Sequence, residues 1–462
     1  MATVNQNVAN RSSWSGKWAF IIAAAASAVG LGNLWRFPYL AAQYGGGMFL
    51  LTYLVLVFTI GVSLLLLEIT VGRHTRFSAI GAFGAMDKRA KFIGVLASAV
   101  PFIITPYYCI IGGWVAKYLV ASVAEGTSVL ADGGVYFTSY ITGGLESFIF
   151  ALAFIAVVMF VVALGVKGGI EKANLVMMPL LLVMALGLAI FTLTMPGAID
   201  GAAYYLIPDF SKFCPELIIA ALGQVFFSLS LAMGIMITYG SYLGSKTDLP
   251  AAVTRIGAFD IGVSFLAGLM IIPAAFVAMG SGEAVAENSG PGLMFVVLPQ
   301  VFDSMGEAGS AIATAFFLLV IFAALTSAIS LCETLVSIIQ DGLNRGRKEA
   351  LIIVGVFVAV AAIFINLGYN GLSWIQPLGE GSTLLDTFDF ISNSVMMPLV
   401  ALLTCIFVGW VIKPKDLVDE IETSSKFSME KAWVFIIKFV APVVVVVILV
   451  AYVAAQFGFF SM

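Results

Sequence analysis

The sequence has few of the residues on which soluble enzymes depend. Of its 462 residues, 10% are charged, one is a histidine and four are cysteines. The single His74 falls in a short charged loop, so we expect neither histidine catalysis nor a histidine metal site. The cysteine pattern predicts neither a disulfide framework nor a metal site, because three lie inside apolar runs and one stands alone: Cys109, Cys332, Cys405 and Cys214. The sequence also has no phosphate-binding GxxxxGK[ST] loop and no nucleophile–base pair, so we expect neither ATP-driven transport nor an enzyme.

Apolar residues are abundant instead. They make up 61% of the chain, and the mean hydropathy is +1.07. This composition predicts an all-α membrane protein with one continuous bundle, whose partner is the lipid bilayer and not a nucleic acid. We expect eleven spans, at 17–40, 46–72, 92–124, 146–165, 169–196, 216–243, 251–279, 309–341, 349–368, 388–412 and 432–456.

The basic residues predict the orientation. Of 22 lysines and arginines, only Arg36, Lys117 and Lys212 fall on the side that the first span reaches, and the other 19 (22 minus 3) fall on the opposite side. Because cytoplasmic loops carry the excess of positive charge, we expect the N-terminus in the cytoplasm. An odd number of spans then places the C-terminus outside the plasma (inner) membrane.

The first span is interrupted at mid-depth by ASAVGLGNLWRF at 26–37. Gly30 and Gly32 weaken the helix by about 1 kcal/mol each relative to alanine, and Asn33 and Arg36 follow. A break frees backbone carbonyls, which together with the Asn33 amide could hold a cation, while the next half-helix offers its N-terminus to an anion. The alternative is that the small residues only allow two helices to pack closely.

The sixth span repeats this pattern, with Gln224, Ser228 and Ser230 inside residues 223–234. Spans 1 and 6 open two successive sets of five, and interrupted helices at corresponding positions indicate a transporter's binding site. An odd number of spans in each set makes the two sets inverted relative to each other.

Further oxygen-bearing side chains fall at the same depth in later spans: Asp260, Ser264, Thr326 and Ser327. A single Ser or Thr in a membrane helix usually bonds only its own backbone, but this all-oxygen set suits Na⁺ better than a thiolate- or imidazole-seeking metal.

Four other features of the spans allow less definite expectations. Glu68 is expected to support broken backbone, since a carboxylate inside a membrane usually faces the bundle interior. The role of Glu333 stays open. Gly169 and Pro179 allow either local unwinding or a simple kink in the fifth span. The pair Tyr107 and Tyr108 in the third span could serve packing or ligand binding.

Several motifs resemble those of the neurotransmitter:sodium symporter family. They are AVGLGNLWRFPY at 28–39, GGG at 45–47, GQVFFSLSLAMGIMITYGSY at 223–242 and AALTSAIS at 323–330. The resemblance covers nearly the whole chain and implies the LeuT fold, a 5+5 inverted repeat with broken spans 1 and 6 plus an eleventh span. In one transporter domain, residues 1–16 would form a cytoplasmic gate segment, 17–196 and 216–412 the two repeats, and 432–456 span 11.

The resemblance further implies a monomer that carries hydrophobic L-amino acids with Na⁺ by alternating access. A first sodium site would use Ala28, Asn33, Ser228 and Asp260, and a second would use Ala26, Val29, Ala323, Thr326 and Ser327. The substrate site would comprise Ala28, Gly32, Ile104, Tyr108, Phe227, Ser228, Ser230, Met233, Ser327 and Leu331. An outer gate would pair Arg36 with Asp389, and an inner gate would pair Arg11 with Asp341 beside Trp14.

Chloride-dependent members of the family hold their anion with residues that match Tyr53, Gln224, Ser228 and Ser264 here. All four are present, but Asp260 adds a fixed charge one helical turn from Ser264. Two negative charges 4–5 Å apart repel by roughly 3–4 kcal/mol at an effective dielectric constant near 20, so we expect no bound chloride.

The alternatives left open are a non-transporting amino-acid sensor on the same fold and a transporter of a different amino-acid-like substrate. A channel fits poorly with charged gates on both sides of a small central site.

Overall fold

The computed structural model describes residues 12–281, 285 and 291–459. Within these residues the ordered elements are helices, and the only β-type pairing is an isolated bridge between Gly46 and Pro208. Nine of the described helices are long and apolar enough to cross a membrane, and a bent pair counts as a tenth if it is taken as one span. The predicted all-helical membrane fold is confirmed.

The first half of the described chain contains one broken helix followed by four long spans. Its main elements are α2 (Lys17–Ala28), η1 (Gly32–Arg36), α3 (Phe37–Gln43), α4 (Gly47–Leu56), η2 (Val57–Gly61), α5 (Val62–Thr75), α6 (Ala79–Met86), α7 (Lys91–Ala124), α8 (Gly133–Thr142), α9 (Leu145–Ala163), η5 (Val166–Ile170), α10 (Glu171–Leu193) and α11 (Ala198–Leu206).

The second half repeats this order, and its broken helix consists of two pieces that are each too short to span a membrane. The elements are α12 (Pro215–Ser228), α13 (Ile235–Ser241), α14 (Leu249–Met279), η7 (Leu293–Val297), α16 (Leu298–Ser304), α17 (Glu307–Leu343), α18 (Arg347–Asn366), η8 (Leu367–Tyr369), α19 (Leu384–Asp389), η9 (Phe390–Met396), α20 (Met397–Ile406), η10 (Phe407–Val411), α21 (Lys415–Glu422), α22 (Glu430–Phe435), η11 (Ile436–Val440) and α23 (Ala441–Gln456).

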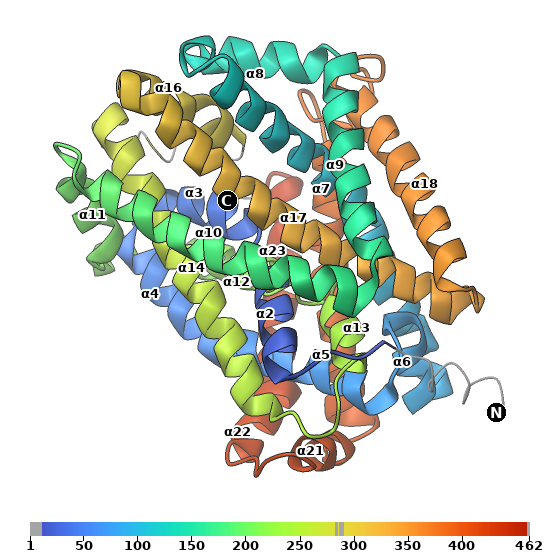
Figure 1. The fold of residues 1–462 in the computed structure, drawn as a ribbon. Helices are drawn as coiled ribbons and strands as arrows, with labels where there is room; N and C mark the ends of the chain where they lie inside the picture. The colour runs from blue at the N-terminus through green and yellow to red at the C-terminus, as the bar shows by residue number, and fades with distance from the viewer. Residues whose placement is uncertain (1–11, 282–284, 286–290, 460–462) are drawn as a thin grey trace.

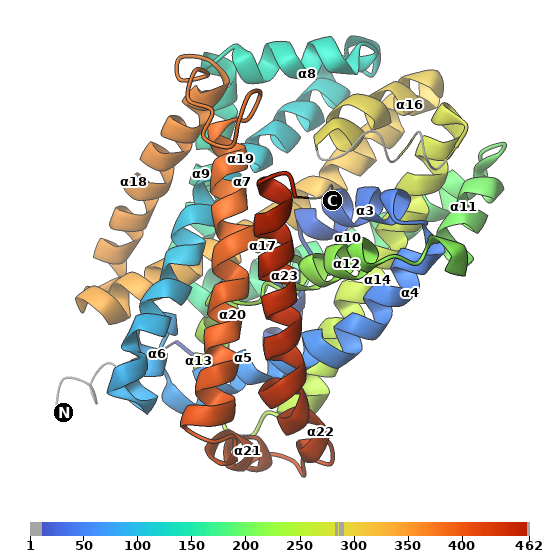
Figure 2. The ribbon, with the colours of Figure 1, turned by 180° about the vertical axis from the view of Figure 1, so that it is seen from behind.

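The broken helices lie inside the bundle, and the unbroken helices surround them (Figure 1). The long helices α7 and α17 pack against each other beside α2, while α9 and α18 lie together on one flank. Seen from behind, α20 and α23 run side by side, with α12 next to α23 (Figure 2). The two breaks at the centre of the molecule are therefore surrounded by complete helices.

Two glycines allow α5 and α13 to approach each other backbone to backbone. A Cβ at Gly72 would lie 1.9 Å from the Ile237 carbonyl oxygen, and a Cβ at Gly240 would lie 2.3 Å from that of Ile69. No larger side chain fits at either position, so the end of span 2 and the second half of span 6 form one packed unit.

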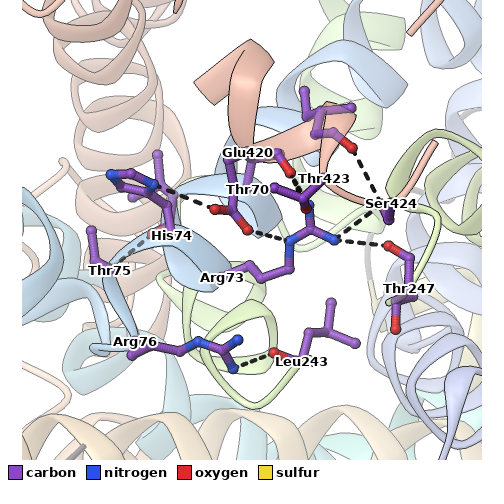
Figure 3. Close-up of polar contacts among 12 residues, drawn as sticks. Thr70, Arg73, His74, Thr75, Arg76, Leu243, Thr247, Glu420, Thr423 and Ser424 are labelled. Carbon is purple, nitrogen blue, oxygen red and sulfur yellow. Dashed lines mark hydrogen bonds and ion pairs between the residues drawn. The ribbon is translucent and has the colours of Figure 1, made fainter. Parts of the chain in front are cut away.

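The end of this unit is held by a buried arginine (Figure 3). The Arg73 side chain has no exposed surface, and it donates to Glu420 at 2.7 Å and to the Thr247 carbonyl at 2.8 Å. His74 lies 3.6 Å from the same carboxylate. Burial works against ionisation of Glu420, but its hydrogen bond with His74 and the charge of Arg73 outweigh burial and lower its pKa. Helix α21 is thereby fastened to the end of α5 and to the loop that follows α13.

Candidate functional site

The first predicted break is present in the structure. Helix α2 ends at Ala28, Val29 has an extended backbone, and the chain resumes as the π-helical turn η1, with a bend of 48° between the two halves. A Cβ at Gly30 would lie 2.4 Å from Ser327 Oγ, and one at Gly32 would lie 2.5 Å from the Phe227 ring. The glycines therefore serve both suggested purposes, since they interrupt the helix and also allow close approach.

The second break lies between Ser228 and Ile235. Ser230 and Ala232 have positive φ angles of 54° and 60°, so the chain here is neither helical nor extended. The Ala232 amide donates to Glu68 at 2.6 Å, which bears out the expected role of this buried carboxylate as a partner for broken backbone. The Ser230 hydroxyl donates to the Ser27 carbonyl at 3.1 Å and so ties the two breaks together.

A buried polar cluster surrounds Asp260 between the breaks. Its carboxylate accepts hydrogen bonds from Asn33 at 2.8 Å, from Tyr53 at 2.6 Å and from Ser228 at 3.3 Å. Asn33 also donates to Ser264 at 2.8 Å. The structure thus brings together the side chains predicted for the first sodium site and most of those of the chloride-type set.

Gln224, the remaining member of the chloride-type set, contacts the first break. It donates to the Gly32 carbonyl at 2.9 Å, and it is buried. Its amide therefore supports the broken backbone of span 1 in this structure.

A second group of oxygens lies between α2 and α17. The Thr326 hydroxyl lies 3.0 Å from the Ala323 carbonyl and 3.5 Å from that of Val29. Ser327 donates instead to the Ser27 carbonyl at 3.1 Å. Ser27 was absent from the predicted set, because nothing in the motif distinguishes its carbonyl from those of its neighbours.

A small cavity of about 20 Å³ lies between the two oxygen clusters, and all ten predicted substrate residues line it. Ser27, Gly30 and Ile235 line it as well. Ile104, Met233 and Leu331 give it an apolar part, whereas the Tyr108 hydroxyl accepts from the Leu31 amide at 3.2 Å and gives it a polar end. Tyr108 therefore reaches the broken backbone and does more than pack in the core.

A larger cavity of about 250 Å³ adjoins the small one, since Phe227 and Tyr108 line both, and we call it the outer cavity because the residues predicted for the outer gate line it. Arg36 and Asp389 line this outer cavity but form no ion pair in the part of the chain that the structure describes. Asp389 accepts from Tyr107 at 3.1 Å, and Arg36 donates to Tyr452 at 3.4 Å. The predicted pair of Arg36 with Asp389 is thus not formed in this structure and stays a prediction.

Aromatic side chains pack together just before the start of α2, where the inner gate is predicted. Trp14 is buried, donates to the Tyr239 carbonyl at 3.1 Å, and contacts the Tyr239 and Tyr242 rings with centroids 5.1 and 6.0 Å away. Asp341 accepts from the amide and hydroxyl of Ser78 at 2.7 and 2.6 Å. Its predicted partner Arg11 lies outside the described residues.

Glu333 has a clear role in the structure that its sequence position did not reveal. It is fully buried and pairs with Arg347 at 2.6 Å, while Tyr242 donates to it at 2.9 Å. Arg347 also donates to the Val162 carbonyl at 2.8 Å, so the ion pair joins α17 to the ends of α9 and α13 and to the start of α18. In the sequence, Glu333 and Arg347 have only a position toward the same end of the bundle in common, and this does not predict that they pair.

The fifth span is not unwound in this structure. Gly169 lies in the π-helical turn η5, where a Cβ would lie 2.0 Å from the Val161 carbonyl oxygen. Helix α10 then continues through Pro179 to Leu193 without a break.

Comparisons with known proteins agree with this geometry. The model of the sodium:neurotransmitter symporter family matches residues 11–130 and 142–458. An uncharacterized sodium-dependent transporter of Bacillus subtilis (strain 168) is 34% identical over 441 residues, covering 94% of this chain and 96% of its own. The human sodium- and chloride-dependent GABA transporter 2 is 27% identical, covering 89% of this chain and 75% of its own.

Among solved structures, a crystal structure of MhsT in complex with L-phenylalanine superposes with a TM-score of 0.87. It is 36% identical in sequence, and the match covers 96% of this chain and all of that one. This likeness confirms the predicted LeuT fold and, with the family match, a secondary transporter and not an enzyme. The chain belongs to the sodium:neurotransmitter symporter family.

Proposed function

We propose that this protein is a chloride-independent symporter that couples the entry of hydrophobic L-amino acids to Na⁺ by alternating access. One observation carries this proposal: two clusters of oxygen atoms lie at the helix breaks, and a small cavity with an apolar part lies between them. It would work as a monomer in the plasma membrane, with the N-terminus in the cytoplasm and the C-terminus outside.

Sodium ions suit the chemistry of the two oxygen clusters. The first site would use Asn33, Ser228 and Asp260 with the Ala28 carbonyl. The second would use Thr326 and Ser327 with the carbonyls of Ala26, Val29 and Ala323. Each set offers oxygen only, and the described residues hold no group of three or more His, Cys, Asp or Glu that could bind a divalent metal. Neutral oxygens with at most one carboxylate suit a monovalent, weakly polarising cation.

The substrate would lie in the small cavity with its carboxylate toward the first sodium, the Gly32 amide and the Tyr108 hydroxyl. Its ammonium group would meet the carbonyls of Ala28, Phe227 and Ser228 and the Ser230 hydroxyl. An α-amino acid is favoured over an amine because Gly30, and no acidic residue, lines this end of the cavity.

The side chain of the substrate would contact Ile104, Met233 and Leu331. Methionine is flexible enough to accept both branched and aromatic side chains, and one methylene changes affinity by only about 1–3 kcal/mol. The L-phenylalanine complex of MhsT supports an aromatic substrate. Leucine, phenylalanine and tryptophan should therefore compete with one another for uptake. Competition by GABA or taurine without leucine or tryptophan would contradict the assignment.

Asp260 would make chloride unnecessary. The Tyr53 and Ser228 hydroxyls, which an anion would need as donors, already donate to its carboxylate. The fixed charge would thus replace the anion in neutralising the first sodium ion, unlike in the relatives named as chloride-dependent.

The gates support alternating access with the outer side open. Trp14 closes the inner end, while the outer cavity reaches Phe227, which also lines the substrate cavity. Bound Na⁺ supplies positive charge to the substrate carboxylate, so each ligand raises the affinity for the other by the same factor. The test is amino-acid uptake into proteoliposomes, compared between an inward Na⁺ gradient and an equal K⁺ gradient.

A further inference from the structure

Helix α23 brings a tyrosine to the outer gate from outside the two five-span sets. The Tyr452 hydroxyl lies 3.4 Å from Arg36 Nη2. These residues are 416 positions apart, and α23 lies against α12 and α20 (Figure 2). A polar group on a largely lipid-facing helix is therefore directed inward, at the charged residue of the proposed outer gate.

The chain makes room for this hydroxyl at Gly223 in α12. A Cβ at Gly223 would lie 1.8 Å from the Tyr452 oxygen and 2.9 Å from its ring carbon Cζ. Any other residue at this position would push the tyrosine away from α12. The close approach fixes where the hydroxyl lies and therefore where it meets Arg36.

The two charges of the gate are both held by other groups in this structure. Arg36 contacts Tyr452, and its guanidinium lies over the Phe227 ring at 5.6 Å. Asp389 accepts hydrogen bonds from Tyr107 and Asn393. Both charged side chains line the outer cavity, so a direct Arg36–Asp389 pair would close the space between them.

We propose that Tyr452 is a positioning residue of the outer gate, which holds Arg36 on the α12 side while the gate is open and releases it when Arg36 pairs with Asp389. The proposal rests on the proposed transport function. The substitution Tyr452→Phe keeps the ring that packs against Gly223 and removes only the hydroxyl oxygen, which accepts the hydrogen bond from Arg36. Loss of this acceptor favours the Arg36–Asp389 pair and hence the closed outer gate.

The gate can be observed without transport by labelling a cysteine in the outer cavity. Leu385→Cys places a thiol among the residues that line it. The background variant is Cys214→Ser, because Cys214 is the partly exposed native cysteine and the other three are buried. Serine is a favourable N-cap residue, which suits the position that Cys214 occupies before α12.

We expect Tyr452→Phe to slow labelling by a membrane-impermeant thiol reagent several-fold, in proteoliposomes with Na⁺ and no amino acid. Tyr369→Phe, which alters a tyrosine that lines the outer cavity, should label at the parent rate. In an Asp389→Asn background the effect of Tyr452→Phe should disappear, because the closing partner is gone. Equal elution of each variant from a sizing column checks folding.

Parent-rate labelling of Tyr452→Phe would overturn the proposal, and so would equal slowing in the Asp389→Asn background. Because the labelling needs neither a substrate nor transport, its result is separate from the failure or success of Na⁺-coupled uptake. If labelling follows the expected pattern but no amino acid is taken up, the gate assignment stands and the transport proposal fails.

Discussion

Tyr53 donates a 2.6 Å hydrogen bond to Asp260, and both side chains are fully buried between the two broken helices. The same hydroxyl lies 2.8 Å from Ser228. A carboxylate thus occupies the centre of a set of donors that would otherwise suit an anion.

Replacing Asp260 should change the ion requirement. Wild-type uptake should be the same in chloride and in gluconate, because the carboxylate supplies the negative charge. Asp260→Asn removes that charge and keeps the shape, so uptake should fall and recover in part with chloride. Wild-type uptake that collapses in gluconate would contradict this prediction.

The second oxygen cluster predicts a sodium effect at Thr326. Thr326→Ala removes the hydroxyl that lies beside the Ala323 and Val29 carbonyls, whereas Thr326→Ser keeps it. We expect the alanine variant to need at least several-fold more Na⁺ for half-maximal uptake and the serine variant to stay near wild type. The measurement is uptake against Na⁺ concentration. If the alanine variant needs no more Na⁺ than the serine variant, the Thr326 hydroxyl is not a sodium ligand.

Glu68 should contribute to stability more than to specificity. Glu68→Leu leaves the buried Ala232 amide without its acceptor, and a buried unsatisfied donor costs about 1–3 kcal/mol. Glu68→Gln keeps a carbonyl oxygen and should cost less. Thermal unfolding of the purified variants in detergent orders the two, and a leucine variant as stable as the glutamine variant would argue against this role.

The contacts of Glu420 that hold α21 predict that the stability of the protein depends on pH. The pKa of Glu420 lies below its ordinary value of 4.5, so the folded state holds this proton less tightly than the unfolded chain does. The stabilisation is therefore complete above about pH 4.5 and is lost as the pH falls below it toward the lower folded value. The Tm of wild type should decrease over this range more than that of Glu420→Gln. Parallel curves for the two proteins would contradict the prediction.

The sequence predicts the parts of this molecule whose signals are local. Gly30 and Gly32 mark the first break, and Glu68 is recognisable because a lone carboxylate in an apolar run needs a polar partner. The ten residues predicted for the substrate site, all of which line one cavity, could be named because their motifs match those of a family with this fold.

Contacts between distant segments could not be predicted in this way. Arg73 meets Glu420 across 347 residues, and Arg36 meets Tyr452 across 416. Their pairing depends on how whole helices pack, and neither residue has a spacing that indicates its partner. The same holds for Glu333, whose partner Arg347 lies on the next helix beyond a turn.

Uptake of labelled L-phenylalanine into proteoliposomes tests the central claim most directly. The liposomes hold the purified protein, contain potassium gluconate, and are diluted into either sodium gluconate or potassium gluconate. The account predicts uphill accumulation in sodium, its loss when a sodium ionophore removes the gradient, and no accumulation in potassium. Equal uptake in the sodium and potassium media would contradict it.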